Sequence, residues 1–479
     1  MQAQAQLSLE VQVAKYDQQL YGLAGPVSSI TVVSGWTEKT TAMLKVAIQR
    51  VVDANPLISG ALEKRGDELF AVARKHHKFV VEIEAPTGFV TPTGSIVEAI
   101  TLVQTDLEPN FIAQSTIGTM ATQIETGGPL FQVLLMKLPA GHMAYAVELS
   151  HLIGDGNTYY QLLHVLNCAM NGKPMPKLKW SSAPESVALP AEYSPQDKAL
   201  HMEGWIPAYV ERIKKWEPGT EQARRGHLQL INMEAVATLK SEYKAHCDAR
   251  NVPFISTNDL ITAGLAELCD PGSLLLMFAN LRGRIPEAQA DLAGNYERGV
   301  IMPSSESIDP TFIRSVTKHW LYYGTEGRPK LSTDDGDPNP KHAIDSSNFV
   351  VVTNWASLTH LIEPPATRVV CHCPTTAFVT GLAGIDMAVV FKADNKGTLA
   401  LLTNHLVGAR GTEIAPRVGA SKIFKRLVSA QPPAPGQAPR VKLDVVRASH
   451  IQFSTSALLL GVGVAAAALG VVLASRRVV

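Results

Sequence analysis

The stretch Ser-His-Leu-Ile-Gly-Asp-Gly at Ser150–Gly156 is the most informative feature of this sequence. The apolar run before it, Met143–Leu149, is typical of a buried or half-buried strand. The apolar residues after it recur at helical spacing: Tyr159, Leu162, Leu163 and Leu166. We therefore expect His151 to lie in a turn between a strand and a helix, where its side chain can reach a cleft.

The residues of this turn favour acid–base chemistry. Asp155 and Gly156 are typical of a tight turn, because glycine tolerates a positive φ and aspartate can bond to its own backbone. A neutral imidazole can take up a proton near pH 7. The pattern H-x-x-x-D-G thus predicts that His151 is a general base. The alternative interpretation is a core histidine that is hydrogen-bonded to Asp155.

Composition excludes some classes of function. The chain has 479 residues, enough for two domains or one large one with sizeable apolar cores. Lys plus Arg and Asp plus Glu number 43 each, and this zero net charge argues against a nucleic-acid-binding protein. The Gly-rich loop that binds phosphates after a first strand is also absent.

Five scattered cysteines are typical of a reducing compartment. Two of them flank a histidine in Cys371-His372-Cys373, but the sequence lacks a second ligand pair at the spacing of a zinc site. We therefore predict buried thiols on a strand and no bound metal.

The last part of the sequence resembles a membrane anchor. Residues 457–474 are 18 residues without a charge, and Arg476 and Arg477 follow them. This length reaches the threshold for a membrane span. The Pro-rich segment Gln431–Pro439 before it is typical of an extended linker. We expect a single-pass C-terminal tail anchor with the catalytic domains facing the cytosol; the alternative is a buried terminal helix.

Strand-like and helix-like segments alternate through both halves of the chain, which indicates an α/β fold. In the first half, a helix over residues 40–54 ends at Asn55-Pro56-Leu57, and a hairpin follows it over 57–62 and 69–73. In the second half, strands are predicted over residues 227–232, 274–281, 349–355, 369–373, 387–392 and 398–403. Helices are expected over 233–248 and 256–269, and a loop over 325–343.

Several short motifs occur in an order that resembles a known superfamily. They are N-P-L at Asn55–Leu57, G-P-L-F-x-V at Gly128–Val133, S-T-N-D at Ser256–Asp259, N-L-R-G-R at Asn280–Arg284, G-N-Y at Gly294–Tyr296 and T-N-W at Thr353–Trp355. With H-x-x-x-D-G, this order resembles the CoA-dependent acyltransferases, which include BAHD enzymes, condensation domains, wax-ester synthases and chloramphenicol acetyltransferase. The resemblance covers roughly residues 15–410.

This resemblance implies two chloramphenicol acetyltransferase-like α/β domains with an interdomain channel. The expected division is residues 1–190 for the first domain, 191–225 for a linker and 226–430 for the second domain. A Pro-rich linker over 431–455 and the transmembrane helix over 456–475 follow. Ser150 stands where many members have a further histidine, and the D-F-G-W-G motif of plant BAHD enzymes is absent, so the resemblance indicates a divergent member.

The resemblance also assigns roles to residues. His151 would remove the proton of the acceptor, and Asp155 would pair with Arg282 and shape the turn. Thr353 and Trp355 would stabilise the oxyanion of the thioester, and Gly156 would allow close approach of the backbone. For Trp355, plain core packing is an equally weighted alternative.

The expected activity is transfer of an acyl group from a CoA thioester to a hydroxyl or amine. Acyl-CoA would be a co-substrate, with no permanently bound cofactor. The expected membrane tail favours a lipophilic acceptor. The alternatives are a catalytically inactive binding or scaffold protein of the same fold, and a thioester or ester hydrolase.

Overall fold

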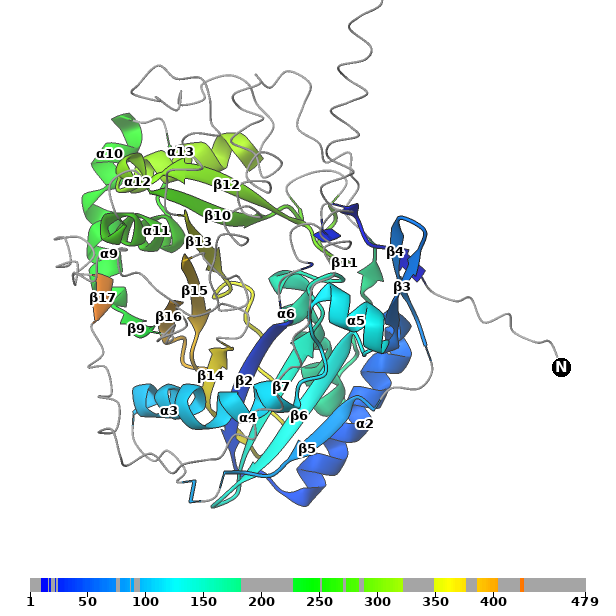
Figure 1. The fold of residues 1–479 in the computed structure, drawn as a ribbon. Coiled ribbons are helices and arrows are strands. Elements are labelled where there is room, and N and C mark those ends of the chain that lie inside the picture. The colour runs from blue at the N-terminus through cyan, green and yellow to red at the C-terminus, as the bar shows by residue number, and fades with distance from the viewer. Residues whose placement is uncertain are drawn as a thin grey trace, which may run out of the picture. The chain divides into compact units, whose positions relative to one another are not determined.

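Two β-sheets organise the described part of the chain in this computed structural model (Figure 1). The structure describes residues 10–181, 227–321, 349–403 and 423–425. Short gaps lie at residues 16, 19–21, 23–24, 75–77, 87, 90–94, 250–251, 270–272, 284–287 and 376–385. Residues Met1–Val428 form one compact unit that contains both sheets. The predicted loop over 325–343 and the predicted membrane segment over 456–475 lie outside the described residues.

The first sheet has five strands in the order β14-β2-β7-β6-β5. They are β14 (Arg368–Pro374), β2 (Val27–Ser34), β7 (His142–Leu149), β6 (Phe131–Leu138) and β5 (Val80–Ile83). Only β5 and β6 are parallel neighbours; the other pairs in this sheet are antiparallel. Strand β14 comes from the second half of the chain, so the first sheet is completed by a segment more than 200 residues away from β7.

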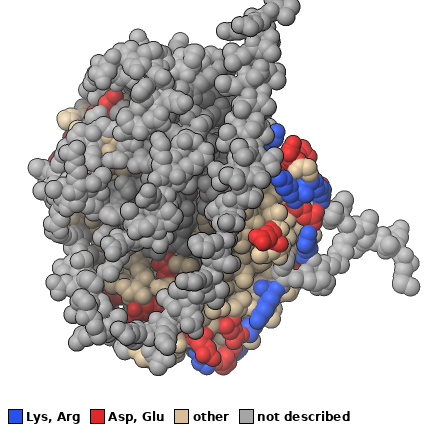
Figure 2. All heavy atoms as spheres, in the orientation of Figure 1, with Lys and Arg blue, Asp and Glu red and all other residues tan. Residues whose placement is uncertain are grey.

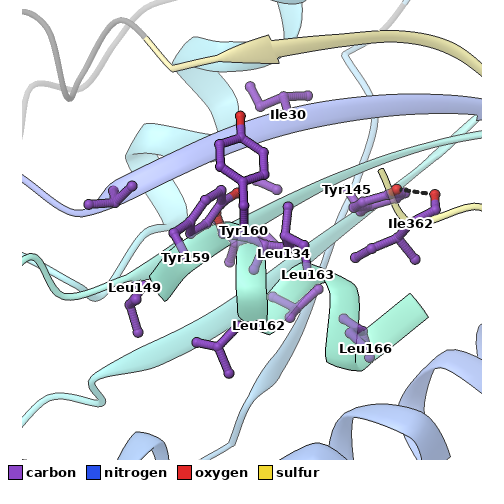
Figure 3. Close-up of a cluster of buried hydrophobic side chains, with 14 of the residues drawn as sticks. Ile30, Leu134, Tyr145, Leu149, Tyr159, Tyr160, Leu162, Leu163, Leu166 and Ile362 are labelled. Atoms are coloured by element: carbon purple, nitrogen blue, oxygen red, sulfur yellow. Dashed lines mark hydrogen bonds between the residues drawn. The ribbon is translucent and has the colours of Figure 1, made fainter. Parts of the chain in front are cut away.

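Two helices of the first half, α2 (Glu38–Ala54) and α6 (Gly156–Met170), pack against each other. The buried residues of α2 include Leu44, Ile48 and Val51, as the apolar spacing predicts, and Thr37 caps its first turn by accepting from the Thr40 N–H. Figure 3 shows Tyr159, Tyr160, Leu163 and Leu166 of α6 in one apolar cluster with Ile30 of β2 and Leu134 of β6.

Shorter helices of the first half, and the segment after α4 (Glu108–Gln114), make polar contacts to the first sheet. These helices are α3 (Ile96–Leu102), α4 and α5 (Met120–Thr126), with a π-helical turn at Val103–Leu107. Glu148 of β7 accepts from the Ser115 hydroxyl at 2.7 Å, and Gln132 of β6 accepts from the Thr116 hydroxyl at 2.9 Å. Burial raises the pKa of Glu148 to about 7.

The second sheet has seven strands in the order β12-β10-β13-β15-β16-β9-β17. They are β12 (Glu297–Pro303), β10 (Leu274–Asn280), β13 (Phe349–Asn354), β15 (Asp386–Lys392), β16 (Leu399–Thr403), β9 (His227–Ile231) and β17 (Phe424–Lys425). The helices of this half are α9 (Met233–Glu242), α10 (Lys244–Ala249), α11 (Thr257–Leu268), α12 (Ser304–Ser307) and α13 (Pro310–Leu321).

Besides the two large sheets, the described residues form two small sheets and an apolar core that both large sheets share. The remaining strands are β1 (Glu10–Gln12), β3 (Ala61–Arg65) and β4 (Glu68–Val72) in one sheet, and β8 (Lys179–Trp180) with β11 (Leu292–Ala293) in another. One apolar cluster contains residues of both large sheets, among them Val147 of β7, Leu276 of β10 and Phe391 of β15. The apolar core is therefore continuous between the two halves of the chain. The domain boundaries at residues 190 and 226 stay a prediction.

Two local expectations are wrong. Residues Pro56–Ser59 form a 3₁₀ helix, so the hairpin begins at Ala61 and not at Leu57. The proline at its first position favours the helical turn, because its φ is already fixed there. The helix expected over 233–248 is two helices, α9 and α10, which meet at Tyr243.

Charged side chains of both signs are mixed on the described surface in Figure 2. Exposed ion pairs join Lys137 with Glu38 at 2.5 Å, and Arg65 with Glu10 at 3.0 Å. This mixture agrees with the equal number of acidic and basic residues in the sequence. Among the described residues, no helix has the length and apolar character that crossing a membrane requires.

The Cys-His-Cys segment lies on β14, where Cys371 and Cys373 are fully buried free thiols, as predicted. His372 between them is also fully buried. Its Nδ1 lies 2.9 Å from the Thr31 hydroxyl of β2, and its Nε2 lies 3.0 Å from the Tyr160 hydroxyl of α6. A neutral imidazole satisfies both bonds, with one nitrogen donating and the other accepting. His372 therefore connects the incoming strand β14 to both β2 and α6.

This histidine predicts a pH dependence of stability. Burial lowers the pKa of His372 from 6.5 to about 3, so below pH 6.5 the unfolded chain binds a proton that the folded chain excludes. Acidification from pH 6.5 therefore destabilises the fold, by up to about 1.4 kcal/mol per pH unit for one such group. His372→Gln should show a shallower decline in unfolding free energy between pH 6.5 and 4.5, measured by urea denaturation. Equal slopes in the two proteins would contradict this assignment, since every other titrating group is common to both.

Candidate active site

The turn that carries His151 has the local structure that the sequence predicts. Strand β7 ends at Leu149, and α6 begins at Gly156. Asp155 is the N-cap residue of α6, and its Oδ1 accepts from the Thr158 N–H at 2.9 Å. A carboxylate is favoured at this position, because it satisfies a free N–H group at the positive end of the helix dipole.

The reason for glycine at position 156 differs from the expectation. Gly156 does not have a positive φ, so the turn does not need glycine for its backbone conformation. A Cβ at this position would lie 2.8 Å from Nε1 of Trp355. Gly156 is therefore required for the close approach of the Trp355 indole to the first turn of α6.

Asp155 and Arg282 form the buried ion pair that the sequence predicts. Arg282 Nη1 lies 2.7 Å from Asp155 Oδ2, and the two side chains are 2% and 1% exposed. Arg282 also donates from Nε to the Leu292 carbonyl at 2.7 Å and from Nη2 to the Gly294 carbonyl at 2.8 Å. Its guanidinium lies 4.9 Å from the centre of the Tyr296 ring. A buried pair is stable only with such additional partners, because removing two charges from water is costly.

The segment Gly294–Tyr296 holds the turn from the other side. The Tyr296 N–H donates to Asp155 Oδ2 at 2.9 Å, and the Gly294 carbonyl accepts from the Asp155 N–H at 3.2 Å. The Asn295 side-chain amide donates to the His151 carbonyl at 2.8 Å. Each residue of the G-N-Y motif thus contacts the H-x-x-x-D-G turn. The two motifs are about 140 residues apart in sequence, so pattern alone does not reveal that they meet.

His151 is buried in this arrangement and is only 5% exposed. Burial lowers the pKa of His151 to about 4, while the Asp155 charge and the Asn295 amide oppose part of this shift. At neutral pH the imidazole is therefore uncharged, which is the form that accepts a proton.

A cavity of about 720 Å³ lies next to this turn. Asp155 and Gly156 line it from α6, and Thr353 and Trp355 line it from β13 and the turn that follows. His151 is not among the lining residues. The structure thus brings four of the predicted site residues to one cavity wall, and places Arg282 and His151 behind that wall. The catalytic roles of His151, Thr353 and Trp355 stay predictions.

Trp355 is fixed by packing as well as by hydrogen bonds. Its backbone N–H donates to the Val390 carbonyl at 2.8 Å, and its backbone carbonyl accepts from the Thr359 hydroxyl at 2.8 Å. The ring of Tyr160 meets the indole edge-on, with 5.9 Å between the ring centres. Trp355 is only 3% exposed. Trp355 is therefore part of the core and also of the cavity wall, so core packing and a role in the site are compatible.

A second, partly buried ion pair, between Asp259 and Arg314, also lines the cavity. Asp259 forms a capping box with Ser256 at the start of α11, which the S-x-x-D spacing indicates. Arg314 of α13 donates to Asp259 Oδ2 from Nε at 2.8 Å and from Nη2 at 2.6 Å. The sequence identifies the cap but not its arginine partner, because the two residues are 55 positions apart.

The Asp155–Arg282 pair generates a stability prediction. Asp155→Asn removes the charge that compensates Arg282, and we expect a loss of about 3–5 kcal/mol in unfolding free energy, since Arg282 stays buried. Asp291→Asn is the matched control, because Asp291 and Lys179 are also 2.7 Å apart but are exposed. The control should leave stability unchanged. Equal urea midpoints for Asp155→Asn and the unmodified chain would contradict the importance of the buried pair.

Comparisons with solved structures identify proteins of similar fold. The structure of F. graminearum TRI101 complexed with coenzyme A and T-2 mycotoxin matches with a TM-score of 0.53 at 14% identity, covering 82% of this chain and 94% of that one. F. sporotrichioides TRI101 complexed with coenzyme A and T-2 matches at 0.52 and 13% identity, with coverage of 82% and 94%. Vinorine synthase matches at 0.51 and 11% identity, with coverage of 82% and 88%.

No protein-family model matches the sequence, and no curated protein sequence matches it either. At 11–14% identity the structural likeness concerns the fold, which extends over about four fifths of this chain. The comparisons therefore show that this chain shares the fold of TRI101 and vinorine synthase, as the resemblance of its motifs implies.

Proposed function

We propose that this chain transfers an acyl group from a CoA thioester to the hydroxyl or amine of a small acceptor. The observation that carries the proposal is the cavity wall formed by Gly156, Thr353 and Trp355, with the turn of His151 fixed behind it. Proteins of the same fold have been crystallised with coenzyme A, and two of them with a toxin as well. These neighbours support acyl-CoA as the co-substrate and a small molecule as the acceptor.

Two lysines of the cavity lining, which also includes the Glu297 carboxylate, suit a polyanionic donor such as CoA. Lys240 and Lys392 both line the cavity. In the part of the chain that the structure describes, neither has a carboxylate within ion-pair distance, although Lys240 donates to the Thr257 hydroxyl at 2.8 Å. Arg314, the third cation of the wall, is matched by Asp259. The two lysines are therefore available to balance negative charge on a ligand.

The proposed reaction needs one proton acceptor and one oxyanion site. His151 removes the proton of the acceptor as its oxygen or nitrogen attacks the thioester carbonyl. Thr353 and Trp355 donate to the oxygen of the tetrahedral intermediate. When the intermediate collapses, the carbon–sulfur bond breaks and the protonated His151 returns the proton to the thiolate of CoA. Because burial lowers the pKa of His151 to about 4, loss of this proton from the imidazolium is favourable near neutral pH.

Asp155 and Arg282 have a positioning role in this proposal. They hold the turn between β7 and α6 in one conformation, and both carboxylate oxygens of Asp155 are occupied by partners within the protein. Holding donor and acceptor in one cavity beside this turn supplies the advantage of proximity, which requires no covalent enzyme intermediate.

A specific observation favours a second candidate, a binding or scaffold protein of the same fold without activity. His151 is buried and is not part of the cavity wall, so a reaction at this residue requires the acceptor to reach behind Gly156. Hydrolysis of the thioester by water is the other alternative, because the same residues would activate a water molecule. The three functions differ in whether thiol is released and whether an acceptor is needed.

A free-thiol assay on the full chain distinguishes these functions. Acetyl-, malonyl-, medium-chain and long-chain acyl-CoA are offered with and without pooled lipophilic alcohols and amines. For an acyltransferase, CoA release requires the acceptor, and His151→Ala lowers turnover by about 10²–10⁴-fold, the usual contribution of a general base. His142→Ala serves as a control, because His142 is at the start of β7, at the opposite end of the strand from the turn that carries His151.

Other outcomes of this assay identify the alternatives. Thiol release without an acceptor would indicate a hydrolase. Turnover that persists in His151→Ala would show that His151 is not the base. No release with any donor from the folded chain would favour the binding protein.

The membrane location is a separate proposal that rests on the sequence of residues 457–474. We propose that this segment spans a membrane, that the catalytic domains face the cytosol, and that a lipophilic acceptor reaches the cavity from the bilayer surface. The full chain should then sediment with membranes and resist extraction by carbonate, and a variant with Leu469→Arg and Val471→Arg should not. Carbonate extraction of the unchanged chain would refute the anchor.

A further inference from the structure

An exposed aromatic ring is among the residues that line the cavity. Phe254 is 55% exposed, although phenylalanine is usually buried in folded proteins. It lines the same cavity as Gly156 and Trp355. Phe254 therefore presents a large flat apolar surface to whatever occupies the cavity.

One face of this ring is covered by a fixed cation. The guanidinium of Arg314 lies 4.8 Å from the centre of the Phe254 ring. Arg314 is held in place by its two hydrogen bonds to Asp259, which is 1% exposed and is itself bound to the start of α11. The guanidinium beside the Phe254 ring is therefore held in position by the buried Asp259 carboxylate.

The Phe254 ring with the Arg314 guanidinium on it favours binding of a planar heteroaromatic ligand. Aromatic side chains bind nucleobases by stacking, and an arginine on the ring strengthens such a site through cation–π contact. Lys240 lines the same cavity near the first turn of α11, where its Nζ lies 2.8 Å from the Thr257 hydroxyl. A base attached to phosphate groups would match both the ring and the positive charge.

We propose that Phe254 stacks on the adenine ring of the CoA donor, with the thioester end of that donor at Thr353 and Trp355. This inference rests on the proposed function, because it takes CoA as the donor. The Phe254 ring would contribute to donor affinity and would discriminate CoA from thioesters that lack the nucleotide. It would not take part in the chemical step.

Calorimetric titration of the full chain with three probes tests this assignment. The probes are CoA, adenosine 3′,5′-bisphosphate, which has the adenine end alone, and pantetheine, which lacks it. Phe254→Ala should weaken binding of CoA and of the bisphosphate by about 5- to 150-fold, the usual effect of losing one stacked base. Pantetheine binding should not change. Phe254→Trp should retain CoA affinity, because it keeps an aromatic face.

Met233→Ala is the matched control, since Met233 is an exposed apolar side chain, 42% accessible, that does not line the cavity. Unchanged CoA affinity in Phe254→Ala would overturn the stacking role. An equal loss for pantetheine and CoA would also overturn it, because the ring would then contact another part of the ligand. If the unmodified chain bound neither CoA nor the bisphosphate, the proposed function itself would fail, and that result is distinguishable from the other two.

Discussion

The buried ion pair between Asp155 and Arg282 determines how the two halves of the chain meet. Asp155 ends the turn after β7 in the first half, and Arg282 follows β10 in the second half. Moving both charges out of water is unfavourable unless every donor finds an acceptor. Here all three nitrogens of the guanidinium donate, and both carboxylate oxygens accept. The conformation that satisfies them is therefore strongly preferred over alternatives.

The geometry of the candidate site follows from this constraint. With Asp155 fixed, α6 begins at Gly156, and the absence of a side chain there admits the Trp355 indole. The same network holds the His151 backbone through Asn295. Strand β14 contributes to the arrangement from the opposite side, because His372 is hydrogen-bonded to Tyr160, whose ring packs on Trp355. Segments from distant parts of the sequence thus support, directly or through a neighbour, the residues that line the cavity.

Much of the secondary structure could be predicted, because local periodicity determines it. The apolar spacing in α2 and the run before His151 predict a helix and a strand close to their observed bounds. The start of helix α3 could be predicted from the capping-box pair Ser95 and Glu98, although the apolar pattern alone does not reveal this helix. The 3₁₀ helix at Pro56–Ser59 could not be predicted in this way, because a short apolar run is equally typical of a strand.

The sequence by itself determined the α/β class, the strand–turn–helix around His151 and the pairing of Asp155 with Arg282 that the family resemblance implies. These features depend on residue type and on spacing within a few residues, or on the order of motifs. Only the tertiary structure decided that β14 joins the first sheet, that Gly294–Tyr296 holds the turn, that Trp355 packs on Gly156 and that His151 lies behind the cavity wall. Such contacts join residues far apart in sequence, and they are set by which buried polar groups find partners.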